Sequence, residues 1–315
     1  MFWLALVQAI HIAASILLAG MFAFRLVVLA PVASRHNCGD RFQPRFKGMW
    51  GGLALVAWLT VVVSAILWFD LVAASMSGAA MLFEVDVNTL QTVLLQTHFG
   101  RLWAFRLVGC LIVGILLFSG SPEQIIAVLS FAILASLAVA GHSGAIVVNT
   151  GPWPVFSDIG HLVAAAFWPG GLLPLLLLLL KQDRAAPQGD RMFIAEVVRR
   201  FSGLSLVVVG ILVATGLLNT YFIVGSPGAL FTTDYGRLLL FKIVLFILML
   251  GLGALNLLVL KPRLSRAAMI ENQIAGTAVM PAQSLIRSVA AEAFLAAVVV
   301  LVVGFLGATP PPMHM

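Results

Sequence analysis

The stretch GLSLVVVGILVATGLLNTYFIV, residues 203–224, contains no charged side chain and no proline. A run of about 20 apolar residues is what an α-helix needs to cross the hydrocarbon core of a bilayer. The rest of the chain has the same character, since 62% of the 315 residues are hydrophobic, 10% are charged and the mean hydropathy is +1.10. A soluble globular protein needs far more polar surface, so the sequence predicts an integral membrane protein.

Apolar runs of this kind occur eight times, and they predict an all-α protein with eight transmembrane helices. Proline, glycine or charged residues bound each run. The first run is too long for the apolar segment of a signal peptide and is therefore kept as a helix. The predicted helices cover residues 2–30, 51–74, 102–120, 124–141, 158–180, 203–224, 238–260 and 289–307.

The lysine and arginine residues set the expected orientation of these helices. They gather in the connections between helices 1 and 2, 5 and 6, and 7 and 8, whereas the alternate connections at 75–98, 142–157 and 225–234 contain none. Because cytoplasmic loops are enriched in Lys and Arg, both termini are predicted to be periplasmic. The net charge of +6 is thereby explained by topology and does not indicate nucleic-acid binding.

An internal repeat divides the chain into two parts. LLQTHFGRLWAFR at 94–106 matches LFTTDYGRLLLFK at 230–242, and IHIAASILLAG at 10–20 aligns more weakly with GHLVAAAFWPG at 160–170, which pairs His11 with His161. The sequence therefore predicts two parallel four-helix repeats related by a pseudo-twofold axis along the membrane normal. Their expected extents are 1–141 for the first half, 142–157 for an external loop and 158–315 for the second half.

Several segments resemble the CopD/PcoD copper resistance proteins of the bacterial inner membrane. They are THFGRLWAFR, GHSGA, GLLNTYFIVGSPGALFTTDYGRLLLFK with LNLLVLKPRL, and SVAAEAFLAAVVVLVVGFL, and the resemblance spans almost the whole chain. It implies copper handling, with movement of copper from the periplasm into the cytoplasm, by a transport protein and not an enzyme. Some relatives carry a periplasmic CopC-like copper-binding domain in the same chain, so the resemblance here implies a separate CopC-like partner.

Four histidines, His11, His98, His142 and His161, are predicted near the external side, where they would form a copper entry site centred on His11 and His161. Imidazole and thioether groups suit copper ions, either Cu(I) or Cu(II) for imidazole. Three of these histidines also have a structural interpretation: a neutral imidazole hydrogen-bonded to a neighbouring helix for His11, and an ordinary polar residue at a helix end or in a loop for His142 and His98.

Two further groups are assigned to this site. Asp158 stands three residues before His161, so it either orients that imidazole ring or caps the helix, and both roles are compatible. The final residues Met313, His314 and Met315 either form a copper-capturing arm or are a plain tail.

Other functional classes stay open at this point. Histidines on separate transmembrane helices also hold haem b, and His11 with His161 would then be axial ligands of an electron-transfer cytochrome. A third possibility is a membrane docking partner for a periplasmic copper chaperone. A Gly-rich phosphate-binding loop is missing, which argues against an ATP-driven pump.

Polar residues and helix breakers inside the predicted membrane region raise further alternatives. Arg25 and Glu292 lie at similar depth and either pair with each other or leave Glu292 as an exit-side ligand or proton carrier. Arg101 and Arg237 lie at the outer ends of helices 3 and 7, and Arg106 and Lys242 lie five residues deeper. These side chains either anchor carbonyl or carboxylate groups, repel cations from unproductive routes, or extend toward lipid headgroups. The segment FWPGGLLP at 167–174 predicts a kink or break in helix 5.

The predicted orientation can be measured with reporter fusions. Fusions after Ser34, Asp190 and Asn272 should report a cytoplasmic position, and a fusion after Met315 a periplasmic one, because the Lys- and Arg-rich connections stay inside. A periplasmic signal from the fusion after Asp190 would contradict the predicted topology.

Overall fold

The computed structural model describes residues 2–35, 39–78, 85–145, 151–181, 188–260 and 279–312. Within these ranges the regular secondary structure is entirely helical. Eight helical segments are long and apolar enough to cross a membrane, which agrees with the predicted number. They are Phe2–Arg35, Gly48–Ser77, His98–Ser119, Glu123–Ala140, Trp153–Leu180, Met192–Val224, Asp234–Leu258 and Gln283–Ala308.

Some of these segments are built from more than one helical element, and short helices lie between others. The first half contains α1 (Phe2–Ala23), the π-helix η1 (Phe24–Leu29), α2 (Ala30–Arg35), α3 (Gly39–Ser77), α4 (Val87–Gln96), α5 (His98–Ser119), α6 (Glu123–Ala135), α7 (Leu137–Ala140) and α8 (His142–Ala145). The second contains α10 (Trp153–Phe167), α11 (Pro169–Leu180), α12 (Gln188–Val224), α13 (Ala229–Thr232), α14 (Asp234–Leu255), the π-helix η2 (Asn256–Leu260) and α16 (Val279–Ala308).

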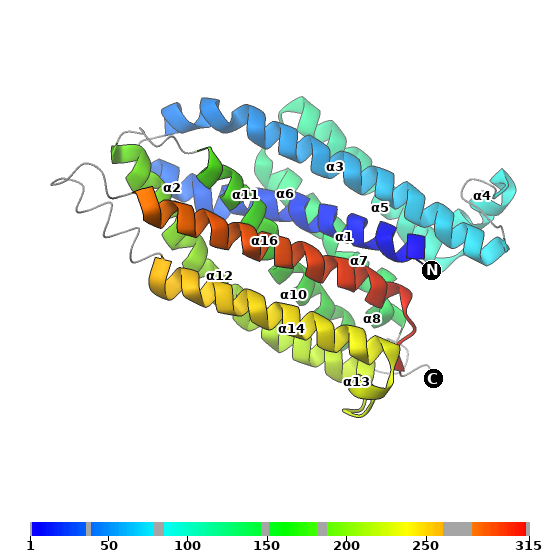
Figure 1. The fold of residues 1–315 in the computed structure, drawn as a ribbon. Helices are drawn as coiled ribbons and strands as arrows, with labels where there is room; N and C mark the ends of the chain where they lie inside the picture. Colours follow the sequence, from blue (N-terminus) through cyan, green and yellow to red (C-terminus); the bar gives the residue numbers. More distant parts are fainter. Residues whose placement is uncertain are drawn as a thin grey trace.

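Helix α1 lies at the centre of the bundle. It packs against α3 and α6 from its own half and against α10, α11 and α16 from the second half. Helix α1 begins and α16 ends at the same end of the bundle, near α7, α8 and α13 (Figure 1). A chain that crosses a membrane an even number of times begins and ends on the same side, so this placement agrees with eight spans.

Helix 5 differs from its predicted bounds. It begins at Trp153 and not at Asp158, because Pro152 and Pro154 stand at its start, where proline is tolerated, and do not keep the segment in a loop. His161 is consequently eight residues into its helix, close to the nine residues that separate His11 from the start of α1. The predicted break in helix 5 is confirmed, since α10 ends at Phe167 and α11 begins at Pro169.

The two halves meet at a backbone contact between Gly20 and Gly170. A Cβ atom at Gly20 would lie 2.3 Å from the carbonyl oxygen of Ala166 and 2.8 Å from the Cα of Gly170. A Cβ atom at Gly170 would lie 2.6 Å from the carbonyl oxygen of Ile16. Only glycine permits this approach, as at the close crossings of other membrane helices.

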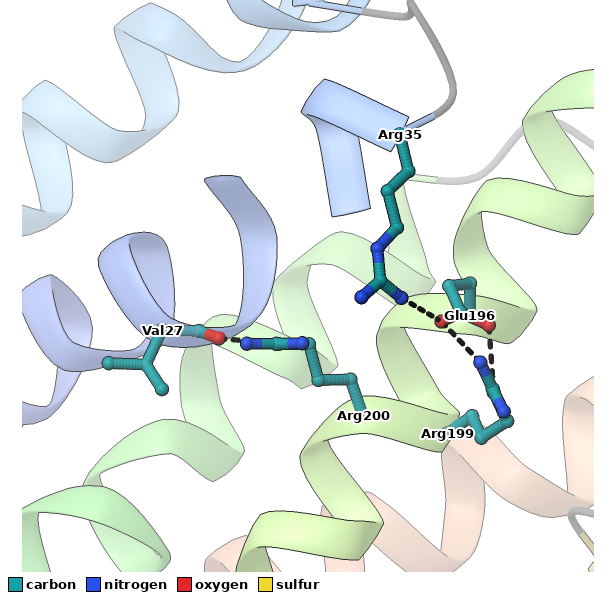
Figure 2. Close-up of polar contacts among 5 residues, drawn as sticks. All are labelled: Val27, Arg35, Glu196, Arg199 and Arg200. Carbon is teal, nitrogen blue, oxygen red and sulfur yellow. Dashed lines mark hydrogen bonds and ion pairs between the residues drawn. The ribbon is translucent and has the colours of Figure 1, made fainter. Parts of the chain in front are cut away.

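Arginine side chains tie helix 1 to helix 6 at the opposite end of the bundle (Figure 2). Arg200 donates from Nε to the carbonyl oxygen of Val27 at 2.6 Å, within the π-helical turn η1. Glu196 accepts two hydrogen bonds from Arg199, at 2.6 and 2.8 Å, and lies 3.7 Å from a guanidinium nitrogen of Arg35. The network therefore joins the two halves at this end.

Arg25 also has a partner at this end of the bundle. The structure pairs it with Glu123 at the start of α6, and Glu292 instead accepts a hydrogen bond from Asn256. The suggested Arg25–Glu292 pair is therefore wrong. Depth alone, which suggested that pair, does not decide which neighbouring helix a side chain faces.

Replacing Gly20 with alanine should destabilise the protein, because the new methyl group meets backbone atoms that cannot rotate away. We expect a loss of about 1–3 kcal/mol, typical of overpacking, seen as a lower midpoint of thermal unfolding in detergent. Gly210→Ala on α12 is the matched control, since a Cβ atom there meets nothing within 4 Å. Equal unfolding midpoints for the two variants would contradict the role given to Gly20.

Candidate functional site

Polar side chains from four helical elements gather at the end of the second half where α10 and α14 begin, which is the end predicted to be external. We call this group the outer polar cluster. It is built by α8, α10, α12 and α14 and consists of His142, Ser143, Asp158, His161, Thr215, Asn219 and Lys242.

The carboxylate of Asp158 links the members of the outer polar cluster. One of its oxygens accepts a hydrogen bond from the hydroxyl of Ser143 at 3.2 Å, and the other accepts one from the amide of Asn219 at 3.3 Å. Lys242 and His142 interact with the same carboxylate electrostatically. Because α10 begins at Trp153, Asp158 is in the second turn of the helix, and its interpretation as a cap is wrong.

The hydrogen bonds of His161 define which ring nitrogen carries its proton. Nδ1 of His161 lies 3.0 Å from the hydroxyl oxygen of Thr215, and that hydroxyl donates its own proton to the carbonyl of Ile211 at 2.6 Å. The hydroxyl oxygen must therefore accept from Nδ1–H. This leaves the lone pair of His161 on Nε2, and the ring also has a hydrogen bond with the backbone of Leu212.

His142 has the opposite tautomer. Its Nε2 lies 3.2 Å from the carbonyl oxygen of Leu306, which can only accept, so Nε2 carries the proton and the lone pair is on Nδ1. The ring of His142 also stands edge-on to Tyr235, with ring centroids 5.9 Å apart. Among the described residues, His142 and His161 thus each have one ring nitrogen whose lone pair is not assigned to a side-chain donor.

His11 is enclosed differently, with 0% of its surface exposed. Its Nδ1 lies 2.9 Å from the hydroxyl of Ser64, and its Nε2 lies 2.6 Å from a guanidinium nitrogen of Arg106. Arginine can only donate, so His11 is a neutral imidazole whose lone pair already accepts a hydrogen bond. Trp68 and Trp103 pack around its ring, at centroid distances of 5.5 and 5.9 Å.

Arg106 is itself 1% exposed and is bound by neutral groups. One guanidinium nitrogen donates to the carbonyl of Ile133 at 2.6 Å and to the hydroxyl of Ser136. The guanidinium also lies 5.1 Å from the ring centroid of Trp103, which is a cation–π distance. Of the interpretations of Arg106, the one in which it anchors a carbonyl is confirmed, although its contact with His11 was not expected.

The surroundings of His11 and His161 share a pattern that was not recognised in the sequence. In each case Nδ1 bonds a hydroxyl residue on the next transmembrane helix, 53 residues later for His11 and 54 for His161. Each hydroxyl also donates to the carbonyl four residues earlier. A Ser or Thr at nearly equal spacing from the two histidines, inside an apolar run, was the signal that could have revealed them.

The remaining predicted ligands are not joined to these groups. His98 is exposed and is the first residue of α5, directly after Thr97, whose hydroxyl caps this helix. Met313, His314 and Met315 lie outside the described residues. No group of three or more His, Cys, Asp or Glu side chains in the described ranges forms a ready metal-binding cluster.

Two family models match the sequence and together cover most of it. The model described as "Copper resistance protein D-like, N-terminal domain" matches residues 1–147, and the model described as "Copper resistance protein D" matches residues 195–306. No solved structure matches the chain.

Three characterised relatives agree with these matches. Copper transport protein CutJ of Bacillus subtilis is 42% identical over 128 residues, which is 41% of this chain but only 23% of CutJ. Copper resistance protein D of Pseudomonas syringae pv. tomato is 28% identical over 95% of this chain and 93% of its own length. Inner membrane protein YebZ of Escherichia coli is 31% identical over 83% of this chain and 85% of its own length. The two family models and the similarity to these relatives show that the chain belongs to the copper resistance protein D family.

Proposed function

We propose that this protein carries copper from the periplasm into the cytoplasm across the inner membrane, and that the outer polar cluster is the site where copper enters. His161 and His142 are the proposed ligands, through Nε2 and Nδ1 respectively. Asp158, which interacts electrostatically with His142, lowers the cost of bringing a cation into the bundle.

The observation that carries this proposal is the tautomer of His161. Its Nδ1–H is held by Thr215, so the lone pair is fixed on Nε2, in the way that protein ligands of metals are usually oriented by a hydrogen bond from the second ring nitrogen. Imidazole nitrogen is a suitable donor for copper.

A site with few ligands suits an ion that must be released again during transport. Binding must be favourable enough for entry and weak enough for release, and a closed cluster of three or four ligands would hold copper too tightly. Met313, His314 and Met315 are proposed to make the first contact with copper outside the membrane. A separate periplasmic CopC-like protein is the proposed donor.

The role proposed for His11 is conditional on Arg106. As long as the guanidinium donates to Nε2, the imidazole has no lone pair for a metal. His11 therefore becomes a copper ligand only after Arg106 withdraws. The same contact argues against haem, because axial ligation would need the ring nitrogen that Arg106 uses.

The two four-helix halves are proposed to be related by a pseudo-twofold axis that passes near Gly20 and Gly170. In a twofold interface, residues that contact their own counterparts lie close to the axis. The matched hydroxyl contacts of His11 and His161 support this arrangement. Thr97 and Thr233 support it as well, since each caps the following helix by accepting from a glycine amide, at 2.8 and 3.0 Å.

Copper binding by the purified protein tests the proposal directly. The protein should be colourless and should bind Cu(I) in competition with a chromophoric chelator, and His161→Ala or His142→Ala should lower both bound copper and cellular copper accumulation. His11→Ala should reduce accumulation while leaving binding in detergent unchanged, since Arg106 already engages that ring. His36→Ala, in the predicted cytoplasmic connection, is the control and should change neither.

Two results would contradict this proposal. One is unchanged copper binding in both the His161 and the His142 variants, when each is produced in normal amounts. The other is a strong Soret band with stoichiometric extractable haem, which would favour the cytochrome.

Thr215→Val tests the tautomer argument separately. The valine has nearly the same shape but cannot accept from Nδ1–H, so the affinity of the site for Cu(I) should fall by about 10-fold, the lower end for losing such a supporting hydrogen bond. Thr220→Val is the matched control on the same helix, because the Thr220 hydroxyl bonds only the carbonyl of Gly216, at 2.8 Å. Equal affinities for the two variants would show that Thr215 does not orient His161.

A further inference from the structure

The second half also contains a buried carboxyl group, that of Glu292, which is not part of the outer polar cluster. Glu292 is on α16, 3% exposed, and nine residues from the start of the membrane-spanning segment Gln283–Ala308. At 1.5 Å per residue this is roughly 14 Å from that end. An ionised carboxylate at such a depth is costly, so a buried acid here indicates function.

The partners of Glu292 are neutral hydrogen-bond donors. The side-chain amide of Asn256 donates to Oε1, and the side chain of Trp168 makes a second hydrogen bond to the carboxyl group. The indole of tryptophan can only donate. Both contacts fix the orientation of the carboxyl group, but neither supplies a positive charge to balance it.

Charged and titratable groups on the neighbouring helices are directed elsewhere. Those on the elements packed against α16, and on the first transmembrane segment, have the following contacts: His11 with Ser64 and Arg106, Arg25 with Glu123, Arg35 with Glu196, Lys242 and Tyr235 with Asp158, and Asp234 with Arg237. Arg287, on α16 itself, is exposed. Within the described residues, Glu292 therefore has no recorded cationic partner.

The backbone is irregular at both hydrogen-bond donors. Trp168 is the residue at the break between α10 and α11, and Asn256 is the first residue of the π-helix η2. Single π-helical turns and broken transmembrane helices both occur often at functional sites. The site of Glu292 thus lies where two helices depart from regular geometry.

Two further polar atoms near Glu292 are buried and unpaired. The amide oxygen of Asn256 and the hydroxyl of Ser288, one turn before Glu292 on the same helix face, have no hydrogen-bond partner in the described part of the chain. Their residues are 9% and 8% exposed. Unpaired polar atoms in such a place point to a ligand, and the three side chains offer oxygen donors, which suit a proton or a hard cation better than a soft copper ion.

We propose that Glu292 is a proton-binding site whose occupancy is coupled to copper movement, an inference that rests on the transport function proposed above. A proton neutralises a single buried carboxylate without any further ligand, whereas a metal cation would need several more oxygens. Copper and protons are then bound by different chemistry at different ends of the second half.

Helix α10 provides the connection between these two sites. Trp168 directly follows the last residue of α10 and is seven residues from His161, close to two helical turns. A shift of α10 when copper binds His161 therefore changes the hydrogen bond that Trp168 makes to Glu292.

The test uses the full-length protein in liposomes that contain a trapped pH-sensitive dye, with Cu(I) added outside under reducing conditions. Wild-type protein should move protons when copper is taken up, and a pH gradient should change the uptake rate. Glu292→Gln should still bind Cu(I) in detergent but lose both effects, while Glu292→Asp should keep them. Glu123→Gln is the matched control, because it removes another membrane carboxylate that pairs with Arg25.

Copper-driven proton movement in Glu292→Gln equal to that of the wild type would overturn the proposal, as would coupling to sodium in place of protons. A second measurement is independent of transport. Infrared spectra of the purified protein over a pH series should contain a carboxylic-acid band that disappears in Glu292→Gln, and its persistence would overturn the assignment of the site. Failure of the wild type to take up copper, with this band intact, would contradict the transport function and the coupling but leave the proton site supported.

Discussion

The close backbone contact between Gly20 and Gly170 is the constraint on which the arrangement of the polar groups depends. It fixes helices 1 and 5 at a separation that any side chain would increase. In both helices a histidine stands nine residues on the outer side of the glycine. His11 and Gly20 lie on one continuous helix, α1, so this crossing fixes the depth of His11 directly, whereas His161 on α10 is separated from Gly170 on α11 by the break at Trp168. The hydroxyl groups of Ser64 on helix 2 and Thr215 on helix 6 hydrogen-bond the rings of His11 and His161.

On this common scaffold the third helix of each half carries a different cation. The planar guanidinium of Arg106 donates in several directions and reaches His11, Ser136 and a backbone carbonyl at once. Lys242 is a compact charge on a flexible stem, and it interacts electrostatically with both Asp158 and His161, with no side-chain hydrogen bond to His161 recorded among the described residues. The exchange of Arg for Lys and the presence of Asp158 thus give two similar histidines opposite properties. His11 has its lone pair occupied by the tethered guanidinium of Arg106, and His161 is the histidine that we propose accepts an external cation.

Most of the helical framework could be predicted from the sequence, because the thickness of the bilayer imposes a length that apolar runs reveal directly. The side-chain contacts could not. The start of helix 5 was placed at Asp158 because Gly151, Pro152 and Pro154 resemble a loop, although proline fits the first turn of a helix equally well. The partner of Arg25 depends on how helix 1 is rotated toward helix 4, and the tautomers of His142 and His161 depend on single acceptor atoms. None of these features leaves a periodic pattern.

The second half contains two irregular helical segments, the break at Trp168 and the π-helix η2, and both lie next to Glu292. Proline at position 169 removes a backbone donor, so helix 5 ends at Phe167 and resumes after Trp168. The π-helical turn of η2 brings Asn256 to the same carboxyl group that Trp168 contacts. Trp168 directly follows the last residue of α10, two helical turns from His161, so under our proposal a small movement of α10 at the copper site changes the hydrogen bond that Trp168 makes to the buried acid.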